Sequence, residues 1–362
     1  MYLATYYQRV RLWNPTGVGK HILHMTAGLE RVFGSVTHIQ EFDDLRKASR
    51  LKVSAVAAPS IQHIIPVPRK ILKACWVKLN YPPLEVFGIS PDWVYCPAED
   101  YVARRHAKLA VTIHDPRPFE DRLYWSQSPD EVAYRAHWQP ILMRLVERAD
   151  VVLTVSEYSR QRIAEVMGIS SERIVIVGNG VEDFFYLNSS VSIEGTDPYI
   201  VMVGGLQPRK GHIHIMELSR LIKRSNSRLR IRVAGKGDAH CEQEAKMAGN
   251  IDLLGYISDQ ELRDLMQRAT AFVMLSEYEG FGIPVIEAMA SRCPAIVLNR
   301  TALPEVAGRA GIVVESAAEA FEAIEAMSIG SQMRNDLVAA GCNHAESFRW
   351  ASCVERLAAV LV

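Results

Sequence analysis

The sequence lacks the features of several protein classes. No apolar run approaches the roughly 20 residues that a membrane-spanning helix requires, so we do not expect the chain to span a bilayer. The six cysteines show no metal-ligand spacing and no secretory leader precedes the first predicted strand, which favours a reducing cytoplasm. Basic and acidic residues each number 41. With no net charge and no basic aromatic platform, a nucleic-acid partner is disfavoured, and any anion site must be local.

A chain of 362 residues is too long to pack around a single hydrophobic core, which favours two domains. Short β-branched runs alternate with segments of helical period, which predicts parallel sheets covered by helices, an α/β fold. The first series of predicted strands is MYLATYY, VSAVAA, WVYC, LAVTIHD, VVLTVS and RIVIV, with helices at residues 17–33, about 130–149, and 157–167. The second series is YIVMVGG, LRIRVAG, IDLLG, AFVMLS, PAIVL and GIVV.

A polar stretch rich in small residues, LNSSVSIEGTDP, separates the two series and has the composition of a linker. We therefore predict an N-terminal Rossmann-like domain over residues 1–185, a C-terminal one over 186–345, and a final helix over 346–362. In that helix Phe348, Trp350, Val354 and Leu357 have helical spacing. Ligands of doubly wound sheets lie beyond the carboxyl ends of the strands, so the loops there are the candidate site.

The N-terminal stretch NPTGVGKH raises the question of a phosphate site. The phosphate loop of NTPases needs a glycine five residues before its Gly-Lys pair and a serine or threonine after it, but Asn14 and His21 occupy these positions. What remains is Gly17, Gly19 and Lys20 in a small-residue turn that leads into a helix. Such a turn can direct backbone N–H groups at an anion, although a helix that merely starts there gives the same pattern.

In the second series, the stretch LQPRKGH places Arg209 and Lys210 between a strand and a helix that starts near His212. Two adjacent cations at a ligand-binding edge indicate an anion site, and the preceding glycines leave room for a ligand. The alternative is an ordinary solvated Arg-Lys pair.

The most informative stretch is SEYEGFGIPVIEAMA, which follows the strand AFVML. Glu279 precedes a glycine loop, Pro284 suits the first position of a helix, and Glu287 is expected in the opening turn of that helix. Acidic residues favour first turns, which explains Glu287 but not Glu279 or the glycines. Because a carboxylate does not bind phosphate, we expect both to bind hydroxyl groups of ribose or sugar beside an anion site.

Taken together, these motifs resemble the family-4 glycosyltransferases, which have the GT-B fold of two facing Rossmann-like domains. The resemblance rests on EGFGIPVIE, with PRKG upstream, GNGV before the linker and NPTGVGKH near the start, and it covers nearly the whole chain. It implies retaining transfer of a sugar from a nucleotide diphosphate sugar across an interdomain cleft, without metal or cofactor. The lack of an Asp-x-Asp motif agrees with this. In this fold the last helix commonly crosses back to the first domain.

The resemblance also implies roles for single residues. Arg209 and Lys210 would clamp the diphosphate, Glu287 would bind the ribose hydroxyls, and Glu279 would bind a hydroxyl of the donor sugar. His114, in VTIHDPRP at a strand end, matches the position of a histidine near the donor sugar; alternatively, it is bonded to its own turn. The leaving phosphate itself would take the acceptor proton, so no protein nucleophile is assigned.

The remaining residues of the predicted donor site act through their backbone. The N–H groups of Phe281 and Gly282 would lie beside the sugar and phosphate, with Ile283 and Gly205 completing the site. Gly17 and Gly19 would close over the phosphate from the other domain, because a glycine backbone can approach a ligand without a Cβ between them.

The TGVG opening resembles that of short bacterial members of the family, and this resemblance implies mannose from GDP-mannose as the donor. We expect the acceptor to be a glycan or lipid-linked glycan in cell-surface polysaccharide synthesis, such as lipopolysaccharide. Two alternative functions stay open: a sugar-nucleotide epimerase of the same fold, and a non-catalytic GT-B scaffold. An epimerase would convert the donor without any acceptor.

A basic amphipathic segment at residues 65–79 suggests a peripheral membrane partner. It combines four cations with four apolar residues: Arg69, Lys70, Lys73 and Lys78 with Ile71, Leu72, Trp76 and Val77. The segment could lie on the anionic inner face of the cytoplasmic membrane. The alternative is a packed helix whose charged face is merely solvated.

Overall fold

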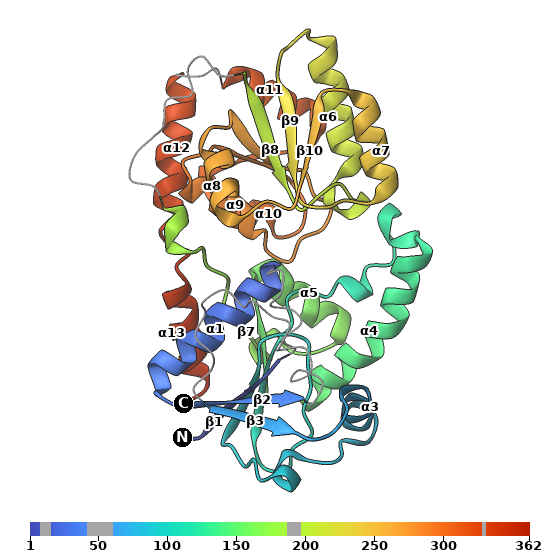
Figure 1. Ribbon diagram of the computed structural model, residues 1–362, viewed down its shortest axis with the longest axis vertical. Helices are drawn as coiled ribbons and strands as arrows, with labels where there is room; N and C mark the ends of the chain where they lie inside the picture. Colours follow the sequence, from blue (N-terminus) through green and yellow to red (C-terminus); the bar gives the residue numbers. More distant parts are fainter. Residues whose placement is uncertain (8–15, 42–60, 187–196, 328–330) are drawn as a thin grey trace. The chain divides into compact units, whose positions relative to one another are not determined.

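The computed structural model describes residues 1–7, 16–41, 61–186, 197–327 and 331–362. These residues form two compact units. Unit 1 comprises Met1–Gly180 and Trp350–Val362, and unit 2 comprises Val181–Arg349. Each unit is a parallel sheet flanked by helices (Figure 1). The predicted strand at 53–58 and most of the predicted linker, residues 187–196, lie outside the described residues.

The sheet of unit 1 has seven strands in the order β3-β2-β1-β4-β5-β6-β7, all paired in parallel. Its strands are β1 Leu3–Tyr6, β2 Val36–Glu41, β3 Ile61–Ile65, β4 Trp93–Cys96, β5 Lys108–Thr112, β6 Val151–Thr154 and β7 Ile174–Ile176. The sequence patterns did not predict β2 and β3. β2 is buried along its whole length, yet its sequence VTHIQE carries polar side chains on both faces, which hides the apolar signal.

The sheet of unit 2 has six parallel strands in the order β10-β9-β8-β11-β12-β13. They are β8 Tyr199–Val203, β9 Arg230–Ala234, β10 Ile251–Gly255, β11 Ala271–Met274, β12 Ala295–Leu298 and β13 Ile312–Val314. All six predicted strands of this half are confirmed. Because the strands are parallel, their carboxyl ends meet at one edge, where the loops after β8 and β11 lie close together.

Helices fill the connections between the strands (Figure 1). Those of unit 1 are α1 Gly17–Phe33, α3 Arg69–Leu79, α4 Pro129–Arg148, α5 Glu157–Met167 and α13 Trp350–Val360. Those of unit 2 are α6 His212–Arg224, α7 Ala239–Ala248, α8 Asp259–Gln267, α9 Ile283–Ala290, α10 Leu303–Ala307, α11 Ala317–Ala326 and α12 Gln332–Ala345. Within the described ranges, none of the helices combines the length and apolarity needed to cross a membrane.

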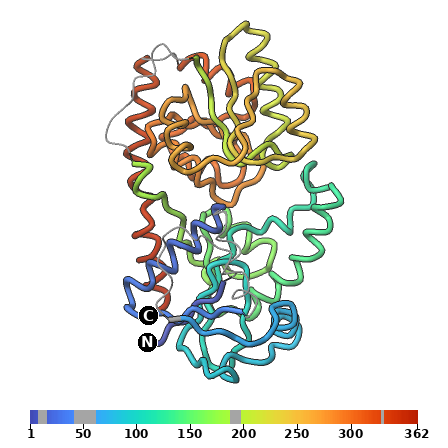
Figure 2. Tube along the Cα trace, in the orientation of Figure 1, coloured from blue at the N-terminus to red at the C-terminus, as the bar shows by residue number. Residues whose placement is uncertain are grey.

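Both faces of the first sheet are covered, as the period of two along β4 shows. Val94 and Cys96 join the apolar cluster that contains side chains of α3, α4 and α5, whereas Trp93 and Tyr95 join the cluster that contains those of α1 and α13. The C-terminal helix α13 therefore packs beside α1, and Figure 2 shows these two segments side by side.

One residue of the predicted final helix behaves differently. Phe348 lies before the first turn of α13 and belongs to unit 2, where its ring packs edge-on against Phe281 at 5.9 Å between centroids. Its helical spacing to Trp350 and Val354 was therefore misleading, because helix ends are the least certain part of a periodic pattern.

Candidate functional site

The loop after β8 is held against the loop after β11. A short 3₁₀ turn, Pro208–Lys210, ends at Gly211, whose φ of 78° is left-handed. A Cβ on Gly211 would lie 1.8 Å from the carbonyl oxygen of Leu275, so only glycine fits there. The N–H of Glu277 donates to the carbonyl of Arg209 at 3.0 Å. These contacts fix the backbone that carries the two predicted cations.

The two cations and Glu279 form one charged cluster. Lys210 Nζ donates to Glu279 Oε1 at 2.6 Å, and Arg209 Nη1 lies 3.9 Å from Glu279 Oε2. Arg209 Nη1 also donates to the carbonyl of Tyr278 at 2.8 Å. All three charged side chains are mostly buried but retain some exposure. The structure thus brings together three of the residues that the sequence predicts for the donor site.

Glu279 is ionised at neutral pH for a physical reason. Burial raises the pKa of its carboxyl, but attraction to Lys210 and Arg209 and hydrogen bonds from Lys210 and Ser276 outweigh this and hold the pKa below its usual value. Its backbone N–H donates to Thr301 Oγ1 at 3.0 Å, which anchors it to the loop after β12. An ionised carboxylate with a fixed backbone is a strong acceptor for hydroxyl groups.

The position of Glu287 corrects the sequence prediction. Helix α9 begins at Ile283 with Gly282 as N-cap, so Pro284 is the second helical residue and Glu287 lies in the second turn instead of the opening one. Glu287 is only 3% exposed. The preference of acidic residues for first turns therefore does not explain it, and an acidic side chain is rarely buried this deeply unless it is paired.

The remaining predicted donor-site residues of unit 2 lie in the same two loops or, for Ile283, at the start of α9. The side chains of Phe281 and Ile283 are buried within unit 2, and contact of the Phe281 backbone with a ligand stays a prediction. Gly282 has a φ of 104°. A Cβ on Gly205 would lie 2.3 Å from the carbonyl oxygen of Lys236, so this glycine is required by packing between the loops after β8 and β9. The sequence interpretation had assigned that space to the ligand.

The predicted glycines of unit 1 lie in a regular helix. Gly17 is the first residue of α1 and Gly19 follows in the first turn, with Thr16 as N-cap in extended conformation. The N–H of Lys20 donates to the carbonyl of Thr16 at 2.9 Å. Asn14 lies outside the described residues. Closure of Gly17 and Gly19 over a phosphate stays a prediction.

His114 follows β5 and is buried. Its Nε2 donates to the carbonyl of Pro97 at 3.1 Å, and its backbone N–H donates to Glu99 Oε1 at 3.0 Å. Both partners belong to the loop after β4. The ring is therefore held by the loop after the neighbouring strand β4. The alternative interpretation, a histidine bonded to its own turn, is wrong.

Sequence reasoning missed a histidine that supports the cluster. His214, on α6, lies with its Nε2 2.6 Å from Glu277 Oε1, and this hydrogen bond is the main reason that the pKa of Glu277 is lowered. Because the N–H of Glu277 binds the carbonyl of Arg209, the contact supports the backbone of the cation loop. No motif links positions 214 and 277, which are brought together only by the fold.

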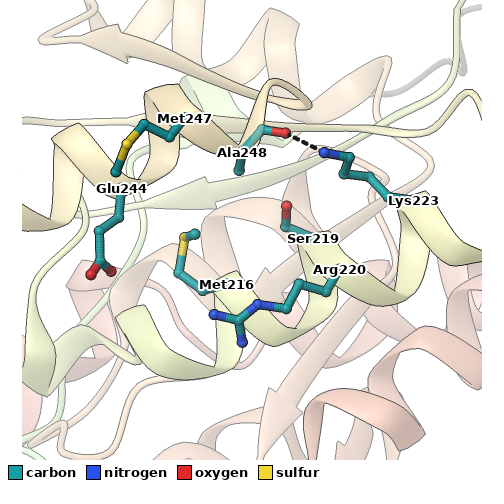
Figure 3. A pocket seen from close by; sticks show the side chains of 7 residues that line it. All are labelled: Met216, Ser219, Arg220, Lys223, Glu244, Met247 and Ala248. Carbon is teal, nitrogen blue, oxygen red and sulfur yellow. Dashed lines mark hydrogen bonds between the residues drawn. The ribbon is translucent and has the colours of Figure 1, made fainter.

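A surface pocket of about 310 Å³ lies between α6 and α7, on the helical layer of unit 2 (Figure 3). Its lining comprises Met216, Ser219, Arg220, Lys223, Glu244, Met247 and Ala248. Lys223 Nζ donates to the carbonyl of Ala248 at 3.0 Å across it. The pocket shares no lining residue with the charged cluster at the strand ends.

In the part of the chain that the structure describes, no group of three or more histidine, cysteine, aspartate or glutamate side chains could hold a metal ion. Metal independence of the reaction stays a prediction.

Comparison with known proteins identifies both halves of the chain. Residues 15–183 match the profile of Glycosyltransferase Family 4, and residues 187–344 match that of Glycosyl transferases group 1. The O-antigen chain mannosyltransferase B of Escherichia coli is 28% identical over 72% of this chain and 72% of its own length. The O-antigen chain mannosyltransferase RfbU of Salmonella typhimurium is 31% identical, over 54% of this chain and about half (53%) of its own length.

Solved structures share the fold. Anabaena HepE, determined in complex with UDP and glucose, superimposes with a TM-score of 0.71 at 16% identity, covering 100% of this chain and 99% of that one. The predicted fold class, two Rossmann-like domains of the GT-B type, is confirmed.

Proposed function

Because the chain belongs to the family-4 glycosyltransferases of the GT-B fold and resembles bacterial mannosyltransferases, we propose that it transfers mannose from GDP-mannose, with retention, to a glycan or lipid-linked glycan. That it is a glycosyltransferase follows from the family. The donor, the stereochemistry and the acceptor are the proposal. Cell-surface polysaccharide synthesis is the proposed setting, because two similar proteins are named as O-antigen chain mannosyltransferases.

The observation that carries the proposal is the cluster of Arg209, Lys210 and Glu279. When the glycosidic bond breaks, negative charge grows on the leaving diphosphate. Cations that are already fixed in place stabilise this transition state more than the ground state. The 3₁₀ turn and Gly211 hold both cations on backbone that needs little rearrangement.

Glu279 has two roles in this proposal. Before the donor binds, its carboxylate neutralises Lys210, because a cation left alone in a largely buried site is costly. After binding, the diphosphate becomes the main partner of the two cations, and Glu279 accepts a hydrogen bond from a hydroxyl of the donor sugar. Glu287 then binds the ribose, and His114 acts near the sugar from unit 1.

The rival activities are separated by one assay. The protein is incubated with labelled GDP-mannose, with and without a glycan acceptor, and the products are analysed. Labelled glycan that forms only with acceptor supports transfer, whereas an altered sugar nucleotide without acceptor supports an epimerase. If neither product forms from GDP-mannose, and none forms when a labelled UDP-sugar or ADP-sugar replaces it, the result supports a non-catalytic scaffold. The anomeric configuration of the product, read by NMR, tests retention.

The proposed donor, GDP-mannose, predicts which nucleotides raise the melting temperature of the protein. At a GDP concentration about 100 times its Kd, binding stabilises the folded protein by about 2.7 kcal/mol, which for a chain of 362 residues raises the Tm by about 3–4 °C. We expect GDP and GDP-mannose to give this shift and UDP and ADP to give little. A shift with UDP but none with GDP would exclude the guanine nucleotide as donor base.

Fewer residues of α3 are exposed for contact with a membrane than the basic segment in the sequence suggests. Within unit 1, Arg69 Nε lies 3.3 Å from Glu41 Oε2, and Lys73 Nζ lies 2.6 Å from Asp100 Oδ1. Two of the four predicted cations of α3 therefore pair within unit 1, Arg69 with the end of β2 and Lys73 with the loop after β4. The exposed face of α3 presents a smaller set: Lys70 and Lys78 with Ile71, 58% exposed, and Leu79, 70% exposed. We propose that this exposed face contacts an anionic membrane.

If the exposed face of α3 binds the membrane, removal of its two lysines should weaken binding to anionic vesicles moderately. Each lysine near an anionic surface contributes about 1 kcal/mol, so Lys70→Ala with Lys78→Ala should weaken binding to anionic vesicles about thirtyfold. Co-sedimentation with phosphatidylglycerol vesicles at low salt measures this. The control is Lys223→Ala with Lys246→Ala, two exposed lysines of unit 2. Equal losses in both double variants would show that net charge, and not α3, determines binding.

A further inference from the structure

A buried histidine in unit 1 connects four separate segments. His21, on α1, is 0% exposed. Its Nδ1 lies 2.8 Å from Asn179 Oδ1, and its Nε2 lies 3.1 Å from the Tyr95 hydroxyl. Its ring meets that of His114 edge-on, with 4.7 Å between centroids. The network therefore joins α1, the end of β4, the loop after β5 and the segment after β7.

The hydrogen bonds define the state of His21. Asn179 Oδ1 can only accept, so His21 Nδ1 carries a proton and donates. Burial, the largest cause, and the neighbouring His114 lower the pKa of His21 well below its usual value, so the ring is neutral and Nε2 accepts from the Tyr95 hydroxyl. That hydroxyl in turn accepts from Thr112 Oγ1, at 3.1 Å. Every polar atom of the ring is thereby satisfied in one tautomer.

Asn179 lies beside the point where the chain leaves unit 1. The chain leaves this unit after Gly180 and re-enters it at Trp350. These two residues are packed closely, because a Cβ on Gly180 would lie 2.5 Å from the backbone nitrogen of Trp350. The Trp350 ring stacks on His24, one turn after His21, at 4.6 Å. The exit and return segments are thus both attached to α1, through His21 and His24.

We propose that His21 is a positioning residue for the reaction: it holds the His114 ring in place and fixes it relative to the segment by which the chain leaves unit 1. This rests on the proposed function, in which His114 acts near the donor sugar. His114 has a hydrogen bond at Nε2 to Pro97, and the edge-on ring of His21 restricts its rotation. An apolar residue at position 21 would fill the space but would leave Asn179 without this ring partner.

The test is a double-mutant cycle on kcat. His21→Phe keeps a ring and removes both nitrogens. We expect it to lower kcat about ten- to a hundredfold, as misplaced catalytic groups do, with little change in the KM for the donor. In a His114→Ala background the same change should lower kcat less than twofold, because its effect passes through His114. His24→Phe, which keeps a ring against Trp350, is the matched control and should leave kcat unchanged.

The opposite outcomes are distinct. If the losses from His21→Phe and His114→Ala multiply, or if folded His21→Phe retains wild-type kcat, the positioning role is wrong. If His114→Ala itself leaves kcat unchanged, the positioning role of His21 is wrong. Sugar transfer by the wild type would still support the proposed function. Should His21→Phe not fold, Tyr95→Phe, which removes only the hydroxyl that bonds Nε2, replaces it in the same cycle and must show the same dependence on His114.

Discussion

We expect Lys210→Met to lower kcat/KM for the nucleotide sugar by about one to two orders of magnitude. In the proposed function Lys210 makes a charge-assisted hydrogen bond to the departing diphosphate. Its loss would remove about 1.5–3 kcal/mol, and each 1.4 kcal/mol is about tenfold in rate. Methionine keeps the unbranched stem that passes Gly204, where Lys210 Cε lies 3.6 Å from the position of a Cβ. The loss is measured in steady-state kinetics with labelled donor.

The variant has a second effect that must be separated from the first. Without Lys210, the carboxylate of Glu279 loses its closest cation, which destabilises the fold by about 1–3 kcal/mol. Lys210→Met combined with Glu279→Gln removes both charges, so most of the stability in urea should return. The rate should stay about ten- to a hundredfold below that of Glu279→Gln alone. If the double variant is as fast as Glu279→Gln alone, the role of Lys210 is structural and the diphosphate clamp is wrong. Lys223→Ala in the same unit serves as the control and should change neither.

The sequence predicted unit 2 more completely than unit 1 for a physical reason. The strands of unit 2 read as short apolar runs, such as AFVM in β11, so both the sheet and the loops at its edge were accessible from pattern alone. In unit 1, β2 buries His38 and Glu41 in specific polar contacts, His38 Nδ1 with Thr5 Oγ1 and Glu41 with the Tyr6 hydroxyl. A buried polar side chain with a partner from another strand looks in the sequence like an exposed one.

The candidate site shows the same limit. Arg209, Lys210 and Glu279 were predicted because their motifs lie directly after strands of a parallel sheet, where the topology brings loops together. The roles of His214 and His21 depend on partners 63 and 158 residues away in the chain, and no local pattern marks such pairs. Likewise, the four cations of α3 look equivalent in sequence, and only the positions of Glu41 and Asp100 show that two of them form ion pairs within unit 1.

Gly211→Ala is expected to destabilise the protein by about 2–5 kcal/mol. A left-handed backbone costs an alanine about 1–2 kcal/mol, and forcing an atom into a filled site typically adds about 1–3 kcal/mol. Here the added Cβ would meet the carbonyl oxygen of Leu275 at 1.8 Å, so the loop after β8 must move away from that after β11. Lys210 moves with it, and kcat/KM should fall even at temperatures where the variant stays folded.

Gly249→Ala is the matched control for this change. Gly249 has a φ of 81°, nearly the same as the 78° of Gly211, but no atom lies within 4 Å of the position of its Cβ. Gly249→Ala should therefore lower the free energy of unfolding only by the cost of a left-handed backbone, about 1–2 kcal/mol. The difference between the two variants in urea denaturation isolates the steric contact between the loops. Equal losses of stability would mean that the loops are not held against each other at Gly211, and the fixed placement of Lys210 that the proposed rate effect requires would have no support.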